Sequence, residues 1–149
     1  MAVFRYRMQN ILSVKEKLET QAKNEFAIAI AELNAEQAKL EEIELRISEL
    51  GNKLAELSMG TLDVLLIRHT EEDIETLKYH ADNQKSKVAM AERKVDIARE
   101  KLTEAVQDRK THEKLKERQF DEFLAEEAAK ESKEIDELVS YRFGQAIEG

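Results

Sequence analysis

The 149-residue sequence has no proline, cysteine or tryptophan, and contains only four glycines. Because an interior proline costs a helix about 3 kcal/mol, its absence is typical of long uninterrupted helices. The absence of cysteine excludes disulfides and thiolate metal sites. No run of about 18 apolar residues occurs, and the opening MAVFRYRMQNIL lacks the apolar stretch of a secretory signal. We therefore expect no transmembrane segment and a cytoplasmic protein.

Charged residues make up 38% of the chain and aromatic residues 5%. Together with a helical hydrophobic pattern, this composition is typical of a coiled coil, and the length suits a single domain over residues 1–149. The net charge of −8 argues against nucleic acid as a partner. Stretch 21–60 carries −4 and stretch 81–120 carries +3, so these two stretches attract each other when they lie side by side.

Two long stretches carry apolar residues at alternating steps of three and four. In the first stretch the steps are regular at Leu40, Ile43, Ile47, Leu50, Leu54 and Leu57. Upstream the pattern reads Phe4, Met8, Ile11, Lys15, Leu18, Ala22, Phe26, Ala29, Leu33 and Glu36, with a stutter between Ala22 and Phe26. The second stretch reads Ile67, Thr70, Ile74, Leu77, Ala81, Gln84, Val88, Ala91, Val95, Ala98, Leu102 and Ala105. After Ala105 the pattern predicts a change of phase.

The pattern is interrupted once, around Gly60, which can adopt the positive φ of a helix C-cap. Either Thr61 or Asp63 can cap the next helix, and a compact apolar cluster follows over residues 62–67. Thr70, followed by three acidic residues, is a second helix-start signal. The sequence leaves two alternatives open: one helix from about residue 62, or a short helix that kinks into a long one near Thr70.

We therefore predict an all-α fold, a long antiparallel two-helix coiled-coil hairpin with unequal arms. The first helix is expected over about 3–58, the turn over 59–61 and the second helix over 62–143, with Gly144 as its terminator. At 1.5 Å per residue the arms are about 84 Å and 123 Å long, which places residue 3 near residue 118. The rest of the second arm has no helix to pair with. Because an isolated helix is marginal in water, we expect it to bind a partner or to self-associate.

Several short stretches do not follow from the heptad pattern. The N-terminus reads FRYRMQNIL over 4–12 and VKEKLE over 14–19, and the second arm reads AVQDRK over 105–110, LKERQF over 115–120 and IDE over 135–137. These stretches resemble the FliJ proteins of the bacterial flagellar type III export apparatus. The resemblance spans the whole chain.

The resemblance implies a coiled-coil stalk similar in shape to the gamma subunit of rotary ATPases, active in flagellum biogenesis at the inner face of the cell membrane. Such a stalk inserts the end with both termini into the hexameric export ATPase, promotes ring assembly, contacts the membrane export gate near the hairpin tip and binds export chaperones. The residues implied to face the ATPase are Phe4, Arg5, Tyr6, Arg7, Arg118, Phe120 and Phe123. Those implied to face the gate are Leu66, Ile74 and Leu77.

Three other interpretations fit the sequence less well. His69, His80 and His112 are too scattered to form a site, and a rod has no desolvated pocket, so we predict no enzyme, metal site or cofactor. The aromatic-basic N-terminus suits either a membrane surface or a partner protein, and its charge of about +2 favours the partner. The rival function is a generic cytoplasmic scaffold, a homodimer in which residues 119–143 pair with themselves.

Overall fold

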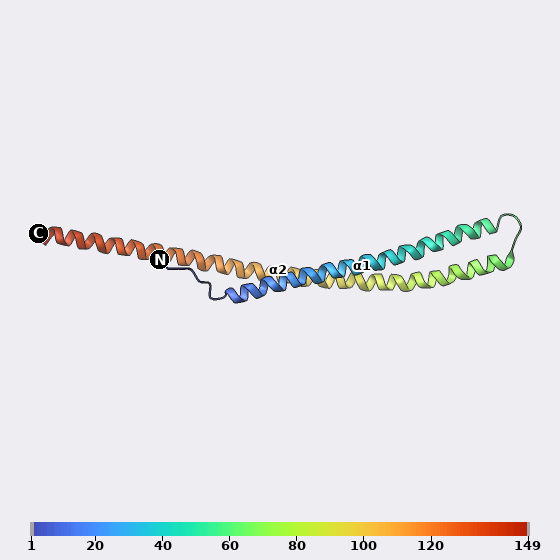
Figure 1. The fold of residues 1–149 in the computed structure, drawn as a ribbon, viewed down its shortest axis with the longest axis horizontal. Coiled ribbons are helices and arrows are strands. Elements are labelled where there is room, and N and C mark those ends of the chain that lie inside the picture. Colours follow the sequence, from blue (N-terminus) through green and yellow to red (C-terminus); the bar gives the residue numbers. More distant parts are fainter. Residues whose placement is uncertain (1, 149) are drawn as a thin grey trace. The chain divides into compact units, whose positions relative to one another are not determined.

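The computed structural model describes residues 2–148, and it describes side chains through residue 146. It contains two helices, α1 (Gln9–Leu57) and α2 (Val64–Glu148), which run antiparallel as a two-helix hairpin (Figure 1). No strand occurs among residues 2–148. The helices contain 49 and 85 residues, so the predicted all-α hairpin with unequal arms is confirmed.

Contacts along the chain form two compact units. The hairpin unit is Thr20–Thr103, and the terminal unit combines Met1–Glu19 with Glu104–Gly149. A single domain therefore stays a prediction.

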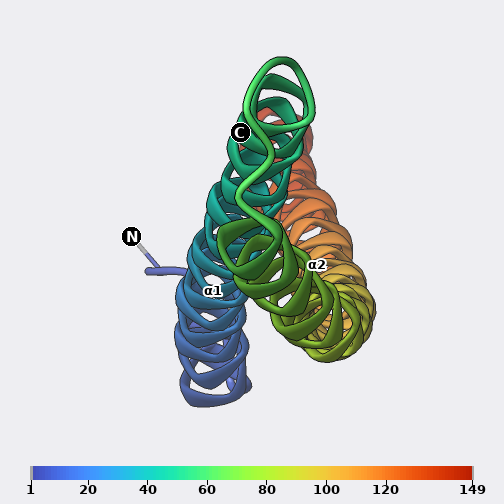
Figure 2. The ribbon, with the colours of Figure 1, turned by 90° about the vertical axis from the view of Figure 1, so that its right-hand side faces the viewer.

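Figure 2 shows the loop of the hairpin unit, in green, where it joins α1 to α2. Caps fix both ends of this loop. Ser58 donates from both its backbone N–H and its hydroxyl to the carbonyl of Leu54, and Gly60 has the expected positive φ of 101°. Asp63 Oδ1 accepts the N–H of Leu66 at 3.1 Å, which makes Asp63 the N-cap. Consequently α2 begins at Val64, two residues later than predicted.

The α2 helix passes through both positions at which the sequence suggested an interruption. Thr70 does not start a helix, because its buried hydroxyl donates within α2 to the Leu66 carbonyl at 2.9 Å. Gly144 does not end one, since α2 continues to Glu148. A glycine inside a helix costs only about 1 kcal/mol relative to alanine, which is too little to end the helix.

The sequence predicts a helix from about residue 3, but α1 begins at Gln9. The described segment before Gln9 is not helical. The N–H of Gln9 bonds to the Tyr6 carbonyl at 3.1 Å, which forms a turn before the helix. Phe4 is half-buried and Tyr6 buried, whereas Arg5 and Arg7 are exposed. Residues two apart share one side of an extended chain but not one face of a helix, so burying both rings requires the extended form.

The seam of the hairpin unit follows the sequence pattern closely. Every predicted seam position from Phe26 to Leu57, and from Ile67 to Leu102, is buried or half-buried. Its most buried apolar cluster is small, formed by Ala29, Val95 and Ala98 with Phe26 and Leu33 packed against it. Small side chains allow close approach of the helices but bury little apolar area.

The seam of the terminal unit has a different phase from the predicted one. Leu12 and Glu19 are buried, whereas Ile11 and Leu18 are 42% and 45% exposed. With this correction the α1 seam alternates steps of four and three without a stutter, through Met8, Leu12, Lys15, Glu19, Ala22, Phe26, Ala29 and Leu33. On α2 the phase does not change after Ala105, since the half-buried positions continue through Arg109, His112, Lys116, Gln119 and Phe123.

Candidate functional site

Three aromatic rings meet where the N-terminal segment lies on α2. The Phe4 ring centroid is 5.1 Å from that of Phe120, edge-on, and 5.5 Å from that of Phe123. Such geometries contribute about 0.5–1.5 kcal/mol beyond the area buried. The structure thus brings together three residues that the sequence analysis assigned to the ATPase surface.

Around these rings the arginines point outward. Arg5 and Arg7 are exposed and line a groove with Phe123 and two acidic side chains of α2, Glu122 and Glu126. The lining of the groove therefore combines apolar side chains with charges of both signs. Of the other candidates, Arg118 is exposed, and Tyr6 is only 7% exposed, so Tyr6 supports the segment rather than presenting a contact surface.

Polar pairs hold the rest of the terminal unit. Lys116 Nζ donates to Gln9 Oε1 at 2.8 Å, and Lys15 Nζ lies 3.5 Å from Asp108 Oδ2. Arg109 pairs with Glu19 across the seam and, at 2.8 Å, with Glu113 on its own helix.

The hydrogen bond to Glu113 raises the pKa of Arg109, and the pairing with Glu19 acts in the same direction. The guanidinium therefore stays charged. Sequence reasoning missed this network, although Arg109 falls on the heptad of the α2 seam.

Beyond Phe123, α2 continues past the N-terminal segment, in orange and red in Figure 1. Every described side chain from residue 131 to 146 is exposed, as the unequal arms predict. The seam heptad continues here only through polar residues and glycine, at Glu126, Lys130, Lys133, Glu137, Ser140 and Gly144. Among the described side chains, five of the six large exposed apolar residues from Leu124 onward fall in another register and gather on one face of the helix, which we call the tail face: Leu124, Ile135, Leu138, Val139 and Phe143.

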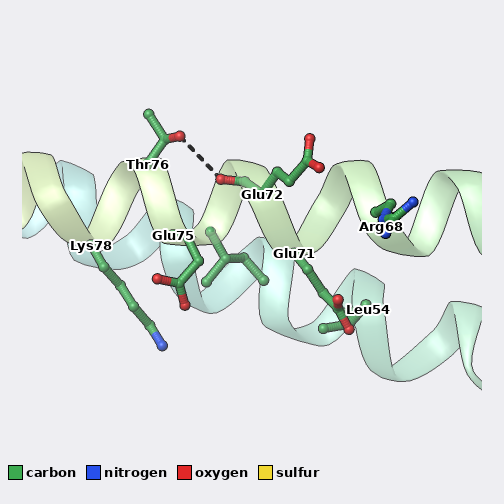
Figure 3. Close-up of a pocket in the computed structure, with 8 residues that line it drawn as sticks. Leu54, Arg68, Glu71, Glu72, Glu75, Thr76 and Lys78 are labelled. Carbon is green, nitrogen blue, oxygen red and sulfur yellow. Dashed lines mark hydrogen bonds between the residues drawn. The ribbon is translucent and has the colours of Figure 1, made fainter.

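The predicted gate-facing residues lie in the hairpin unit and differ in exposure. Leu66 is exposed, whereas Ile74 and Leu77 occupy seam positions and are half-buried between the helices. Ile74 still reaches an open groove, which Figure 3 shows with Leu54 of α1 opposite Glu71 of α2. The same groove is lined by Arg68, Glu72, Glu75, Thr76 and Lys78.

The described residues contain neither a cluster of metal-binding side chains nor a membrane-spanning helix. Among residues 2–148, no group of three metal-binding side chains converges. His69 lies in the hairpin unit, 3.9 Å from Glu72, and His112 lies in the terminal unit. Neither helix has a stretch within the described range that is long and apolar enough to cross a membrane.

Comparisons with known proteins agree with the resemblance of the sequence. The family model of the flagellar FliJ protein matches residues 4–148. A flagellar FliJ protein of Bacillus subtilis (strain 168) is 29% identical over 142 residues, covering 94% of this chain and 95% of its relative. The solved structure of a YscO homologue from Chlamydia trachomatis shares the fold, with a TM-score of 0.59 and 24% identity over 91% of this chain and 93% of its own. The chain therefore belongs to the flagellar FliJ protein family, whose members are components of flagellar type III export.

Proposed function

We propose that this protein is a stalk that binds the hexameric flagellar export ATPase through its terminal unit, promotes assembly of the ATPase ring and couples the ring to the membrane export gate. It acts at the cytoplasmic base of the flagellum, on the inner face of the membrane, where it also binds export chaperones. It performs no chemistry of its own.

The aromatic cluster with its outward arginines carries this proposal. Phe4, Phe120 and Phe123 form an ordered apolar base, and Arg5 and Arg7 project from the extended segment beside it. Aromatic side chains and arginine dominate the binding energy of protein interfaces. Because the segment is already packed on α2, little conformational entropy is lost on docking.

The tail face supports a different protein as partner rather than a second copy of the chain. Residues 121–149 carry a net charge of −6, and Glu127, Glu131 and Glu134 lie beside the apolar residues along the helix. Two such helices packed side by side would bring like charges together, which is unfavourable. An apolar surface with basic residues at its rim would complement this face. A homodimer in which residues 119–143 pair with themselves does not supply such a surface.

The decisive experiment mixes the protein with the flagellar export ATPase of the same organism and measures ATP hydrolysis and ring formation. The unsubstituted chain should stimulate both. Arg5→Ala/Arg7→Ala should weaken binding by about tenfold or more, since central interface arginines typically contribute over 1 kcal/mol each. The matched control is Arg46→Ala/Arg93→Ala, which removes two exposed arginines of the hairpin unit. Absence of stimulation by the unsubstituted chain would refute the stalk.

A truncation after Glu127 removes most of the tail face and leaves the aromatic cluster complete. It therefore tests the contribution of the tail by itself. We expect the truncated chain to bind the ATPase more weakly. In sedimentation, both the full chain and the truncated chain should be monomers. A dimer of the full chain that becomes a monomer on truncation would support the homodimeric scaffold instead.

A further inference from the structure

A groove runs between α1 and α2 in the hairpin unit, over residues 25–36 of α1 and 87–101 of α2. It consists of two adjoining hollows that share Glu32 and Lys94. Three buried alanines of the seam also line it: Ala29, Ala91 and Ala98. Their small side chains fill little of the space between the helices. We call this surface the seam groove.

Three large apolar side chains line the seam groove and are exposed. Ile28 of α1 is 60% exposed, and Met90 and Ile97 of α2 are 58% and 53% exposed. Met90 and Ile97 are seven positions apart, so they lie on the same flank of α2. Large apolar side chains that a fold leaves uncovered in one place mark an interaction site.

The charged residues of the seam groove are sorted by sign. Those of α2 are basic and those of α1 are acidic: Lys87, Lys94 and Lys101, and Glu25, Glu32 and Glu36. The three lysines are each seven positions apart and therefore form one row along α2. Lys94 Nζ lies 4.0 Å from Glu32 Oε2, and both side chains are more than half exposed. Such a pair contributes at most about 1 kcal/mol, so a partner can replace it at little cost.

This arrangement fits one further helix. A groove between two helices with apolar residues at heptad spacing accepts a third helix whose own apolar residues recur at steps of three and four. Residues 87–101 of α2 extend over about 21 Å, which is about four turns of such a helix. The charges then require acidic side chains along the flank that faces the lysine row and basic side chains along the flank that faces α1.

Other occupants suit the seam groove less well. The phosphates of a lipid surface or a nucleic acid would be repelled by the glutamates of α1. A stable interface between two folded copies takes about 20–30 residues a side. The sorted charges extend over only two heptads, because Lys39 follows Glu25 and Glu32 at the same heptad position of α1.

We infer that the seam groove binds a single amphipathic helix of another protein, acidic along one flank and basic along the other, to form a three-helix coiled coil. This contact goes beyond the proposed function, which assigns the ATPase to the terminal unit. Neither contact requires the other.

The first test measures charge matching by fluorescence anisotropy with two labelled synthetic peptides of about three heptads. Both have leucine at the apolar positions. The matched peptide has glutamate along one flank and lysine along the other, and the basic peptide has lysine along both. A peptide with the flanks exchanged is no control, because it would match the groove by lying in the opposite direction. The full chain should bind the matched peptide about tenfold or more tightly than the basic one, since like charges oppose the basic peptide along the lysine row.

A variant of the lysine row should reverse this preference. Lys87→Glu/Lys94→Glu/Lys101→Glu makes both edges of the groove acidic, so the basic peptide should now bind more tightly than the matched one. The control is Lys53→Glu/Lys85→Glu/Arg93→Glu, which changes the net charge equally at exposed residues outside the groove. It should keep the preference of the unsubstituted chain.

The second test concerns the apolar side chains. Met90→Ser/Ile97→Ser should weaken binding of the matched peptide by about tenfold or more, because two large apolar side chains no longer pack against it. Leu45→Ser/Leu65→Ser, at exposed leucines of the same unit outside the groove, should bind as the unsubstituted chain does. Circular dichroism should show equal helicity in all these proteins.

Three results would overturn the inference. They are equal binding of both peptides by the unsubstituted chain, a preference that the lysine-row variant does not reverse, and full binding of the matched peptide by Met90→Ser/Ile97→Ser. Self-association of the full chain in sedimentation that the lysine-row variant loses would assign the groove to a second copy and overturn it as well. Stimulation of the export ATPase is unaffected by these outcomes, so the proposed function is tested separately.

Discussion

Polar side chains occupy seam positions in both units, and several of them pair across the seam. In the hairpin unit, Gln84 Nε2 donates to the Glu36 carbonyl at 2.9 Å and also to the Glu36 carboxylate. In the terminal unit, Glu19 pairs with Arg109. A polar seam position costs stability relative to an apolar one but fixes the register of the pairing. These two pairs therefore set the axial alignment of α1 on α2 within their units.

The Glu36–Gln84 pair predicts a pH dependence. The hydrogen bond from Gln84 lowers the pKa of Glu36 below its ordinary value of 4.5, and Lys39 acts in the same direction. A carboxyl group whose pKa is lower in the folded state adds stability above its unfolded pKa, and this contribution is lost as pH falls through the folded pKa. The free energy of unfolding, measured in urea from neutral pH to about pH 3, should fall less in Glu36→Gln than in the unsubstituted chain. Exposed Glu42→Gln is the control, and an unchanged slope in Glu36→Gln would contradict the prediction.

Tyr6 has a buried hydroxyl with no hydrogen-bond partner. Burying an unpaired polar group costs about 1–3 kcal/mol, so Tyr6→Phe should stabilise the terminal unit by about 1 kcal/mol. Hydrogen exchange of the amides over 9–19 should slow accordingly. Tyr79→Phe, at an exposed tyrosine, should change nothing. Faster exchange in Tyr6→Phe would mean that the hydroxyl is bonded after all.

At the scale of whole elements, the sequence predicted what depends on apolar spacing. The steps of three and four gave both helices, and Gly60 gave the turn with its positive φ. The predicted start of α1 is wrong because a helical period was applied to residues 4–7. Aromatic and basic residues alternate there, which is the pattern of an extended chain. The predicted seam phase is wrong near residues 11 and 18 because it places apolar residues in the seam and leaves Glu19 outside it. Glu19 is buried because it pairs with Arg109, which is 90 positions away in the sequence.

The end of α2 should be the least stable helical segment. No described side chain over 131–146 is buried, and a helix without tertiary contacts is marginal in water. Amides over 128–146 should therefore exchange far faster than those over 81–102, where α2 packs in the seam of the hairpin unit. Addition of the export ATPase should slow exchange over 128–146 if the tail face docks. Slow exchange in the free monomer would mean that the tail is stable without a partner.

At the scale of the whole molecule, different kinds of interaction hold the helices together within each of the two units. The seam of the hairpin unit is largely apolar, with one polar pair, whereas that of the terminal unit contains Lys15, Glu19, Arg109 and Lys116. Salt screens exposed and half-exposed ion pairs but has little effect of this kind on apolar contacts. Pairing of the helices in the terminal unit, where we propose that the ATPase binds, should therefore depend on ionic strength.

Raising NaCl from about 0.1 M to 1 M shortens the Debye length from about 10 Å to 3 Å. Hydrogen exchange should then become faster over 9–19 and 104–116, and should change little over 26–57 and 67–98. The double variant Lys15→Gln/Asp108→Asn removes the more exposed ion pair of the terminal unit and should reduce this salt effect. Arg109→Leu should destabilise the terminal unit, because it leaves the Glu19 carboxylate in the seam without the guanidinium. Equal acceleration in both units, or an undiminished salt effect in the double variant, would show that these ion pairs do not hold the terminal unit.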